Sequence, residues 1–600
     1  MDDTNSLVKQ RREKLDALRA KGIDPFKNKF TPTESCDVAR KNYIEGREVA
    51  LAGRITAHRE MGKSMFVDIR DQSGRIQIYA QKNAIEEKAP GSWDVFTHLD
   101  LADFIGVKGT LFTTKTGEIS VKLASFVILA KALRPPPAKW HGLEDTEIRY
   151  RQRYLDLMAN PEVKDIFLKR SEIIREIRNF LHARGFVEVE TPMMQAIPGG
   201  AAAQPFKTHH NALGCDFYLR IALELYLKRL LVGGVDKVFE IGRNFRNEGL
   251  SRKHNPEFTM LEVYQAFGDY ESMMELVESM VKHVAEKVLG TLKIPRRQSG
   301  AIASAIDQAV KMMDQFSADE FTEIIRNKAA AKITEAIQAL RNQLWDLRNS
   351  LGIKPEKEVA EQADNIITRW ISTVVATKLP PEYGTQKTEE EIIEAAKPFF
   401  GKFMTGLKGP IFALKYAAND SEIDLSKWRR VKYRDLVRKF TGADWFEISP
   451  TERRQRAHDL GADITKDYAD FEVTGAVFEK LIEPTLIQPT FVTHLPKELV
   501  PLAKLSPDDP TTVEVFECCI NGQEIAPAYT EQNDPIEQRE RLEHQAGGEQ
   551  QKLDEDFLIA LEHGMPPAGG MGMGIDRLCM MLLGQESIRD VILFPQLKPK

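Results

Sequence analysis

The segment from residue 238 to residue 262 constrains the fold of this chain more than any other. Two apolar runs predict buried strands, and they contain Val238, Phe239, Ile241, Phe258, Met260 and Leu261. The loop between them is charged and contains Arg243, Arg246, Glu248, Arg252, Lys253 and His254. Such a hairpin can hold a guanidinium over a phosphate and an aromatic ring against a purine. An exposed, salt-bridged hairpin has a similar composition, so the order of the residues has to decide between the two interpretations.

Length and charge set the broad class. A chain of 600 residues is long enough for about three or four domains, each with its own core. Its 42% hydrophobic and 29% charged residues are ordinary for a globular protein. The net charge of −6 gives no general attraction to nucleic acid. Any RNA contact must therefore come from local basic surfaces.

The start of the chain is one candidate for such a surface. The segment from Ser6 to Gly22 is predicted to be helical, and its basic residues are Lys9, Arg11, Arg12, Lys14, Arg19 and Lys21. A charge run of this kind is more often the solvated face of a helix. A role in RNA binding and a purely solvated face both stay open.

The sequence also predicts a cytoplasmic protein. Its five cysteines form no C-x-x-C pair, which suits a reducing compartment. The N-terminus lacks the basic and apolar regions of a signal peptide, and no apolar run is long enough to cross a membrane.

Short strands dominate the next region. We expect residues 1–47 to form a helical extension and residues 48–134 to form a small β-barrel, with strands in 49–52, 65–69, 76–79 and 104–107. The strand spacing alone does not separate an OB-fold from other small barrels. The run Arg134-Pro-Pro-Pro137 predicts a stiff linker at the end of this region.

Two further segments have clear patterns. Residues Val163 to Arg184 are predicted to be helical, because apolar residues recur at helical spacing and Gly185 provides a stop. A strand over 186–190 and the pair Thr191-Pro192 follow. Near the C-terminus, Gly570-Met-Gly-Met-Gly-Ile-Asp-Arg577 is predicted to open a helix.

Residues 296–421 have a different, strongly helical pattern. A heptad seam contains Ile333, Ile337, Leu340, Leu344, Leu347 and Leu351. Further helices are expected over 366–375 and 390–399. A seam this short favours the core of a helical bundle over an intermolecular coiled coil.

The order of residues in the opening segment decides its interpretation. Phe245-Arg-Asn-Glu248, a basic loop with His254, and Pro256-Glu-Phe-Thr-Met-Leu-Glu262 resemble motif 2 of class II aminoacyl-tRNA synthetases, most closely the lysyl-tRNA synthetases. The helix, strand and proline over 163–192 resemble motif 1, and Gly570 to Arg577 resembles motif 3.

This resemblance implies an α+β protein. It would have an N-terminal OB-fold barrel for anticodon binding and a class II antiparallel-sheet catalytic domain. The catalytic domain would run over 150–295 and 422–600, interrupted by an α-helical insertion at 296–421. The implied enzyme is a homodimeric lysine–tRNA ligase that uses ATP and Mg²⁺. It would activate L-lysine to lysyl-adenylate and transfer it to the 3′-end of tRNA(Lys).

Carboxylate activation needs no strong base, because the nucleophile is already an anion. The demand is for positioned arginines and a divalent metal that stabilise charge on the phosphates. By resemblance, the catalytic residues are Arg246 and Arg577. The implied ATP-binding residues are Arg246, Glu248, His254, Phe258, Glu517, Gly574 and Arg577, and the implied magnesium ligands are Glu517 and Glu524.

The resemblance also implies the other sites. The lysine-binding residues would be Gly200, Glu224, Glu262, Tyr264, Tyr529 and Glu531. Glutamates in apolar strands are costly unless a cation arrives to pair them, so they favour a cationic substrate. The anticodon-binding residues would be Arg59, Phe66, Gln77 and Glu118. Phe66 could equally belong to the core of the barrel.

Three positions depart from the family pattern. Pro527 stands where the family usually has an asparagine that helps to hold the lysine carboxylate, and proline offers no donor there. Leu223 replaces a proline before Glu224, which we expect to loosen the entry to a strand. His58 stands where an arginine is common in the anticodon domain.

Two other functions compete with the ligase. One is a paralogue that loads lysine or a β-amino isomer onto a protein, but such paralogues lack the barrel. The other is an RNA-binding or scaffolding protein that has lost catalysis, which the presence of Arg246, Glu517, Glu524 and Arg577 disfavours.

Overall fold

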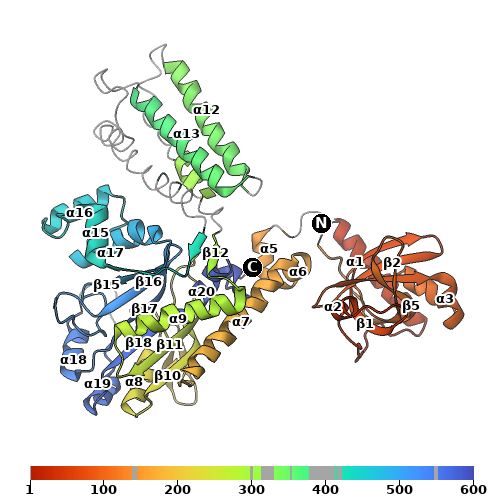
Figure 1. Cartoon of the computed structure of the whole chain (residues 1–600), viewed down its shortest axis with the longest axis horizontal. Helices are drawn as coiled ribbons and strands as arrows, with labels where there is room; N and C mark the ends of the chain where they lie inside the picture. The colour runs from red at the N-terminus through yellow and green to blue at the C-terminus, as the bar shows by residue number, and fades with distance from the viewer. Residues whose placement is uncertain are drawn as a thin grey trace. The chain divides into compact units, whose positions relative to one another are not determined.

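The computed structural model divides the chain into two compact units, Met1–Pro161 and Glu162–Lys600 (Figure 1). Each unit is described by itself. The structure describes residues 2–137, 143, 145–296, 302–303, 305–311, 330–351, 354–376, 411, 414, 422–545 and 552–599. Across these ranges no helix is long and apolar enough to cross a membrane.

The first unit contains the predicted barrel. Five strands close it in the order β1-β2-β3-β5-β4, and their bounds are β1 Glu48–Met61, β2 Ser64–Arg70, β3 Arg75–Gln81, β4 Phe104–Thr113 and β5 Ile119–Ala130. Its helices are α1 Asp2–Ala20, α2 Cys36–Lys41, α3 Lys82–Lys88, α4 Ser92–Thr97, α5 Thr146–Arg151 and α6 Arg153–Ala159. The barrel closes because alternate strand residues are apolar and fill its interior, among them Met65, Val67, Ile69, Ile76 and Ile78.

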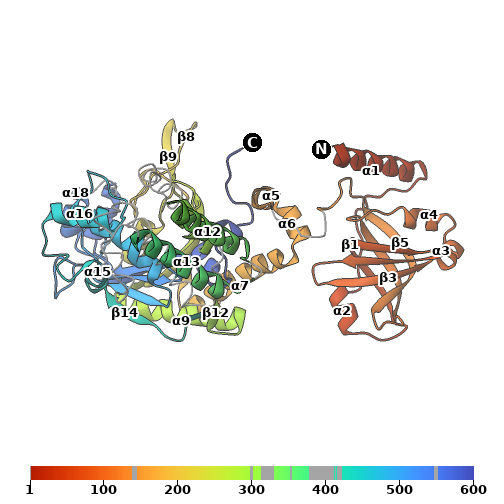
Figure 2. The same cartoon turned by 90° about the horizontal axis from the view of Figure 1, so that it is seen from above.

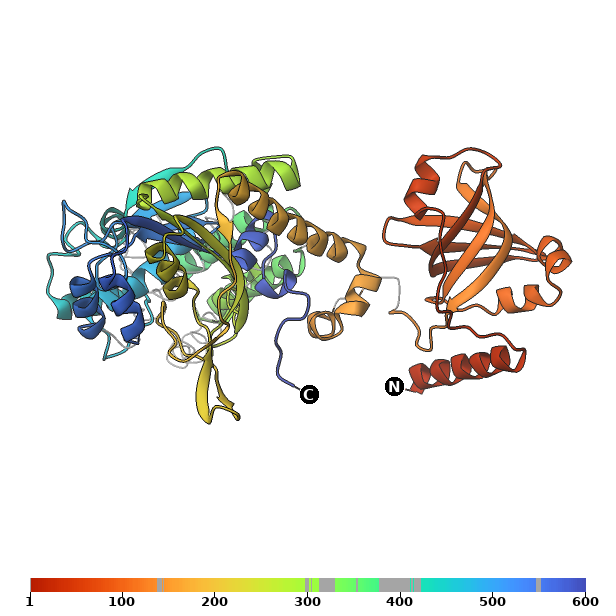
Figure 3. The same cartoon turned by 90° about the horizontal axis from the view of Figure 1, so that it is seen from below.

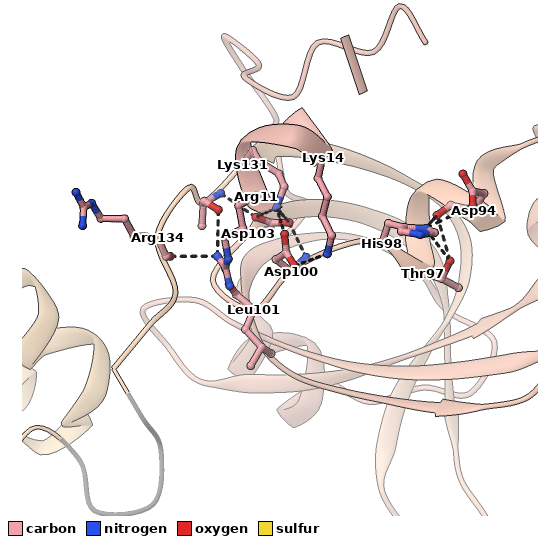
Figure 4. Close-up of polar contacts among 11 residues, drawn as sticks. Arg11, Lys14, Asp94, Thr97, His98, Asp100, Leu101, Asp103, Lys131 and Arg134 are labelled. Atoms are coloured by element: carbon pink, nitrogen blue, oxygen red, sulfur yellow. Dashed lines mark hydrogen bonds and ion pairs between the residues drawn. The ribbon is translucent and has the colours of Figure 1, made fainter. Parts of the chain in front are cut away.

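Helix α1 is attached to the barrel along one face (Figure 4). The buried guanidinium of Arg11 donates to the carbonyl oxygens of Leu101, Ala132 and Arg134 at 3.1, 3.0 and 3.1 Å. Beside it, Lys14 pairs with Asp100 at 2.7 Å. The basic residues Lys9, Arg12 and Arg19 stay exposed. The helix therefore uses some of its basic residues to dock and leaves others in solvent.

The second unit is built on an eight-stranded sheet in the order β14-β15-β16-β17-β18-β11-β10-β6. The strands are β6 Val187–Glu188, β10 Lys237–Phe245, β11 Glu257–Ala266, β14 Arg429–Lys432, β15 Thr490–Thr493, β16 Val515–Ile520, β17 Gln523–Thr530 and β18 Ala568–Gly574. Neighbours pair antiparallel except β10 with β6 and β14 with β15. The predicted antiparallel catalytic sheet is therefore confirmed.

Three long or apolar helices pack against this sheet and form its main core (Figures 1 and 3). They are α7 Pro161–Ala183, α9 Tyr270–Leu289 and α20 Ile575–Leu582. The other helices are α8 Glu224–Val232, α15 Tyr433–Thr441, α16 Pro450–Asp459, α17 Asp470–Val477, η2 Phe478–Ile482, η3 Glu483–Thr485, α18 Pro535–Glu543, α19 Glu555–Glu562 and η4 Ile588–Asp590. A small sheet of β7 Met194–Gln195, β8 Lys207–His210 and β9 Cys215–Leu219 includes a hairpin that extends outward (Figure 2).

Two elements differ from the sequence prediction. The strand expected over 186–190 is only two residues long, Val187–Glu188. The glycine run before Asp576 forms strand β18 rather than a helix start, and α20 begins after it at Ile575. Glycine is needed within this strand because an added Cβ at Gly570 would lie 2.0 Å from Glu531 Oε1. Close packing on a central strand, not a tight turn, explains this glycine.

The helical region lies between two short paired strands. β12 Lys293–Pro295 pairs antiparallel with β13 Glu422–Asp424, with Ile294 opposite Ile423. Between them, α12 Ala330–Asn349 and α13 Glu356–Ala376 pack together. Leu344 and Leu347 of the heptad seam are buried, as expected for the core of a bundle. The helix expected over 390–399 lies outside the described residues, and the insertion boundaries stay a prediction.

A buried ion pair packs against Gly242 of β10 and supports a stability prediction. Arg220 donates to Glu240 at 2.7 Å and to the Arg243 carbonyl at 2.8 Å, and its side chain is 2% exposed. A Cβ at Gly242 would lie 2.0 Å from the Arg220 guanidinium. We predict that Gly242→Ala lowers the free energy of unfolding by about 2–3 kcal/mol, because it displaces this pair.

Urea denaturation followed by circular dichroism measures the change. Gly475→Ala is the matched control, since Gly475 lies in helix α17 with open space around its Cβ position. The control should be neutral or slightly stabilising. Equal unfolding midpoints for the two variants would contradict the prediction.

Candidate active site

A cavity of about 240 Å³ lies beside strands β11, β17 and β18. Six of the residues expected to bind ATP line it, namely Arg246, Glu248, His254, Phe258, Gly574 and Arg577. Glu524 and Pro527 also line it, whereas Glu517 does not. The strands β10 and β11 and the basic loop between them are confirmed, and they bring most of the predicted nucleotide residues to one place.

Two arginines meet in this cavity from opposite ends of the sequence. The Arg246 guanidinium lies over the Phe258 ring, 5.2 Å from its centroid. Burial lowers the pKa of Arg246, and the neighbouring Glu248 opposes this shift. Arg577 donates to the Glu524 carbonyl at 3.0 Å. Because an arginine in a protein keeps its charge, the cavity presents two fixed cations to an anionic ligand.

The contacts of His254 define its protonation state. Its Nε2 lies 3.1 Å from Arg577 Nη2, and its Nδ1 lies 2.8 Å from Ser251 Oγ. Arginine can only donate, so we assign Nε2 as the acceptor and Nδ1–H as the donor. Burial, and then the charge of Arg577, lower the pKa of His254. His254 is therefore a neutral side chain that holds Arg577 in the cavity.

The two expected metal ligands sit on one hairpin. Glu517 and Glu524 belong to β16 and β17, which are joined by Asn521 and Gly522, both with positive φ. The Asn-Gly sequence of this turn fits a tight two-residue hairpin. Burial raises the pKa of both carboxyls, and the charge of Glu524 raises the pKa of Glu517 further, whereas Arg577 opposes the shift at both. The hairpin thus holds a pair of carboxylates that lack a full counter-charge.

The basic loop of the β10–β11 hairpin is anchored beside these carboxylates. Lys253 Nζ lies 2.9 Å from Glu483 and donates to the Gly522 carbonyl at 2.9 Å. Glu483 also raises the pKa of Glu517 and Glu524. The position of Glu483 was not predicted, because nothing in the sequence links η3 to this hairpin.

A buried contact fixes the helix that carries Arg577. Asp576 accepts from the Thr259 backbone N–H at 2.7 Å and pairs with Arg170 of α7 at 2.7 Å. Thr259 adjoins Phe258, and Asp576 adjoins Arg577. The three predicted motifs therefore meet at one ion pair, which sets the distance between the aromatic ring and the second arginine.

A buried cluster of acidic side chains, Glu224, Glu262 and Glu531, lies beside the same strand, and we call it the acidic pocket. Phe258, Met260, Glu262 and Tyr264 alternate along one face of β11, and the first two line the cavity. Tyr264 donates to Glu262 at 3.0 Å, and both are buried. The nearby Tyr529 hydroxyl donates to Glu224 at 2.6 Å. Five of the six residues expected to bind lysine, Glu224, Glu262, Tyr264, Tyr529 and Glu531, influence one another electrostatically here.

Burial governs the charge of this pocket. It raises the pKa of Glu262 to about 7 and that of Glu531 to about 8. Gly200, the sixth residue, has φ +83°, and a Cβ on it would lie 3.1 Å from the Cβ of Glu224. The close approach of this loop to Glu224 therefore requires glycine.

Two expectations about Glu224 are wrong. It begins helix α8 and does not lie in a strand. Its charge is also already paired without a substrate cation. Lys228, one turn later on α8, pairs with Glu224 at 2.6 Å and pairs with Glu531 as well. The i,i+4 spacing of Glu224 and Lys228 is visible in the sequence and could have indicated the first pair.

The three departures from the family pattern have different outcomes. Leu223 does not loosen the site, because its side chain is fully buried and its N–H donates to Glu262 at 3.0 Å. A proline could not make that bond. Pro527 lies opposite Glu517 in β17 and borders the cavity. His58 is exposed on the barrel strand β1.

The expected anticodon residues lie on the outer side of the barrel, where Gln77 is itself buried. Phe66 is absent from the barrel core and packs against Tyr79, with ring centroids 4.8 Å apart. Gln77 accepts from Ser120 at 3.0 Å on the same face. Arg59 lies opposite Phe66 in the strand pairing, and Glu118 lies 3.3 Å from Arg75. Tyr79 was not predicted, although its alternation with Gln77 places it there.

Comparisons with known proteins agree with this geometry. Residues 145–598 match the family described as tRNA synthetases class II (D, K and N). The chain belongs to this family. Residues 49–129 match the OB-fold nucleic acid binding domain, which confirms the OB-fold expected from the resemblance.

Full-length relatives narrow the family further. The lysine–tRNA ligase of Pelotomaculum thermopropionicum is 42% identical over 610 residues, covering 100% of this chain and 96% of the relative. The lysine–tRNA ligase of Carboxydothermus hydrogenoformans is 42% identical over 607 residues, covering 100% and 99%. The lysine–tRNA ligase of Moorella thermoacetica is 41% identical over 609 residues, with the same coverage.

Proposed function

We propose that this class II synthetase is a lysine–tRNA ligase, which activates L-lysine with ATP and transfers it to the 3′-end of tRNA(Lys). One observation carries the proposal. A single face of β11 joins the arginine-lined cavity, at Phe258 and Met260, to the acidic pocket, at Glu262 and Tyr264. An anionic nucleotide and a cationic amino acid would therefore bind side by side.

The chemistry is electrostatic. The lysine carboxylate attacks the α-phosphorus of ATP and pyrophosphate leaves, so negative charge grows on the phosphoryl oxygens. We propose that Arg246 holds the α-phosphate and the carboxylate, while Arg577, oriented by His254, holds the departing phosphates. Phe258 offers its ring to the adenine, and Glu248 and Gly574 border the nucleotide. Fixed cations in a partly buried site need no reorganisation during the reaction.

Magnesium fits the β16–β17 hairpin. Glu517 and Glu524 are half-buried carboxyls whose pKa values are raised by burial and by the charge of Glu483, so a divalent cation would offset their negative charge. Two carboxylates suffice for Mg²⁺ because phosphate oxygens and water complete its coordination. When bound, the ion supplies additional positive charge against the phosphates.

The amino-acid site would use the acidic pocket. Gly200 and Glu224 are placed for the α-ammonium, Glu262, Tyr264 and Glu531 for the ε-ammonium, and the Tyr529 ring for the aliphatic stem. Two ammonium groups against three buried glutamates favour lysine over amino acids with a single ammonium.

The transfer RNA and the dimer complete the proposal. The outer face of the barrel, with Arg59, Phe66, Gln77 and Glu118, would stack on and read anticodon bases. Exposed apolar side chains around the motif 1 region would form the homodimer contact, and they are Leu168, Val187, Met193 and Met194. The insertion over 296–421 and a cytoplasmic location stay predictions of the sequence.

Amino-acid-dependent ATP–pyrophosphate exchange tests the proposed function first. We predict exchange with L-lysine and little or none with aspartate, asparagine, ornithine or β-lysine, because only lysine places two ammonium groups at the proposed spacing. Removing Mg²⁺ with EDTA should abolish the exchange. An enzyme that exchanged with none of these amino acids would contradict the proposal and favour a binding protein.

Lysine binding should release protons. The free pocket holds protons on Glu262 and Glu531, whose pKa values are raised to about 7 and about 8. An ammonium ligand lowers both pKa values, so binding releases protons and tightens as the pH rises from 6 to 8, by up to about tenfold per pH unit for each proton. Calorimetry at pH 7 in buffers of different ionisation enthalpy counts them.

The Glu531→Gln variant is the control for this measurement. It should release fewer protons at pH 7, where Glu531 makes the larger contribution. Binding enthalpies that are the same in every buffer would contradict the prediction.

Pro527 generates a separate prediction. Because Pro527 borders the cavity without an N–H or an amide, we predict that Pro527→Asn lowers the KM for lysine by about tenfold, the effect of one added hydrogen bond to a charged group. Pro527→Ala is the matched control, since it restores only the backbone N–H. No improvement in the asparagine variant would mean that another group holds the carboxylate.

A further inference from the structure

Lys228 is a buried charge that the proposed reaction does not yet use. Its side chain is 0% exposed and lies on α8. Its ammonium pairs with Glu224 at 2.6 Å and with Glu531, which comes from the end of β17. A lysine this deep in a protein is rare unless it is paired, so its position needs an explanation.

Three elements enclose the Lys228 ammonium. It lies over the Tyr529 ring of β17, 5.6 Å from the centroid, and over the Phe557 ring of α19 at 5.8 Å. The Tyr529 hydroxyl donates to Glu224, which fixes the other side of the pair. On β11, Glu262 and Tyr264 are bonded to each other instead. The ammonium thus contacts one of the proposed α-ammonium ligands and one of the proposed ε-ammonium ligands.

The charges of the pocket balance only when Lys228 is included. When all are ionised, Glu224, Glu262 and Glu531 carry three negative charges. The positive charge of Lys228 reduces the net negative charge of the pocket to two. Lysine brings two ammonium groups into the pocket, while its carboxylate faces Arg246. A pocket without Lys228 would keep one buried carboxylate without a counter-charge, and such a group takes up a proton instead.

We propose that Lys228 is a positioning residue that supplies the internal counter-charge for Glu531, and so lets that carboxylate bind the substrate's side-chain ammonium as an ion. The inference rests on the proposed function. It adds a determinant of specificity that does not itself touch the substrate.

A purely structural role for the ion pair predicts something different. Buried ion pairs are often no more stabilising than apolar residues of similar volume. If the pair had only a structural role, its loss would change folding, or would change the KM values for lysine and ATP alike. A counter-charge for Glu531 changes the response to an ammonium side chain and leaves ATP binding unaltered.

The test compares Lys228→Met with the unchanged enzyme. The readouts are KM values for lysine and ATP in pyrophosphate exchange, and the inhibition constant of 6-hydroxynorleucine, a neutral analogue of lysine. We expect the preference for lysine over this analogue to fall by at least about tenfold at pH 7.5, equal to a rise of one unit in the pKa of Glu531. The pH profile for lysine should move to higher pH, and the KM for ATP should not change.

Two further variants keep the inference testable if Lys228→Met does not fold. Lys228→Arg retains the charge and should recover most of the preference and the original pH profile. The double variant Lys228→Met/Glu531→Gln leaves no unpaired charge at Glu531, and it should match Glu531→Gln alone in its preference for lysine. A further loss of preference in the double variant would overturn the inference, as would an unchanged pH profile in Lys228→Met.

The outcomes also separate this inference from the proposed function. An unchanged enzyme that shows no lysine-dependent exchange contradicts the proposed function itself. Lysine-dependent exchange together with an unaltered lysine preference in Lys228→Met contradicts only the role of Lys228.

Discussion

The pairing of β11 between β10 and β18 is the constraint on which the rest of the catalytic unit depends. Its register places Glu262 opposite Glu240 on one side and opposite Gly572 on the other. Because side chains alternate along a strand, this register puts Phe258, Met260, Glu262 and Tyr264 on one face. A shift by one residue would turn all four side chains to the opposite face of the sheet.

Burial of charge is the second organising feature. The unit holds many of its ionisable groups in pairs that join distant segments, such as Arg220 with Glu240, Arg170 with Asp576, and Lys228 with Glu531. Each pair fixes an element that carries a proposed ligand contact. The carboxyls with incomplete pairing, Glu517 and Glu524, are the ones proposed to face metal and phosphate. Incomplete pairing is thus a feature of the proposed metal site, whereas Glu224 and Glu531 of the proposed lysine site already share Lys228.

Much of the architecture follows from local patterns. Short apolar runs predict the barrel strands and β10 and β11, and helical spacing predicts α7. The errors occur where long-range packing overrides local preference. Glycine is needed at position 570 of the central strand β18, because Tyr264 and Glu531 occupy the space that a side chain would fill. Glu224 begins a helix whose next turn supplies its partner.

The sequence by itself determined the order of most elements, because this order depends on local spacing, and its resemblance to a known family implied the fold and most of the proposed ligand contacts. Only the tertiary structure decided which carboxylates are already paired, that His254 is neutral, and that the Leu223 N–H bonds to Glu262. These properties depend on distances between segments far apart in the chain. Burial and neighbouring charges then shift the pKa of each group and so set its charge, and no local sequence pattern encodes this.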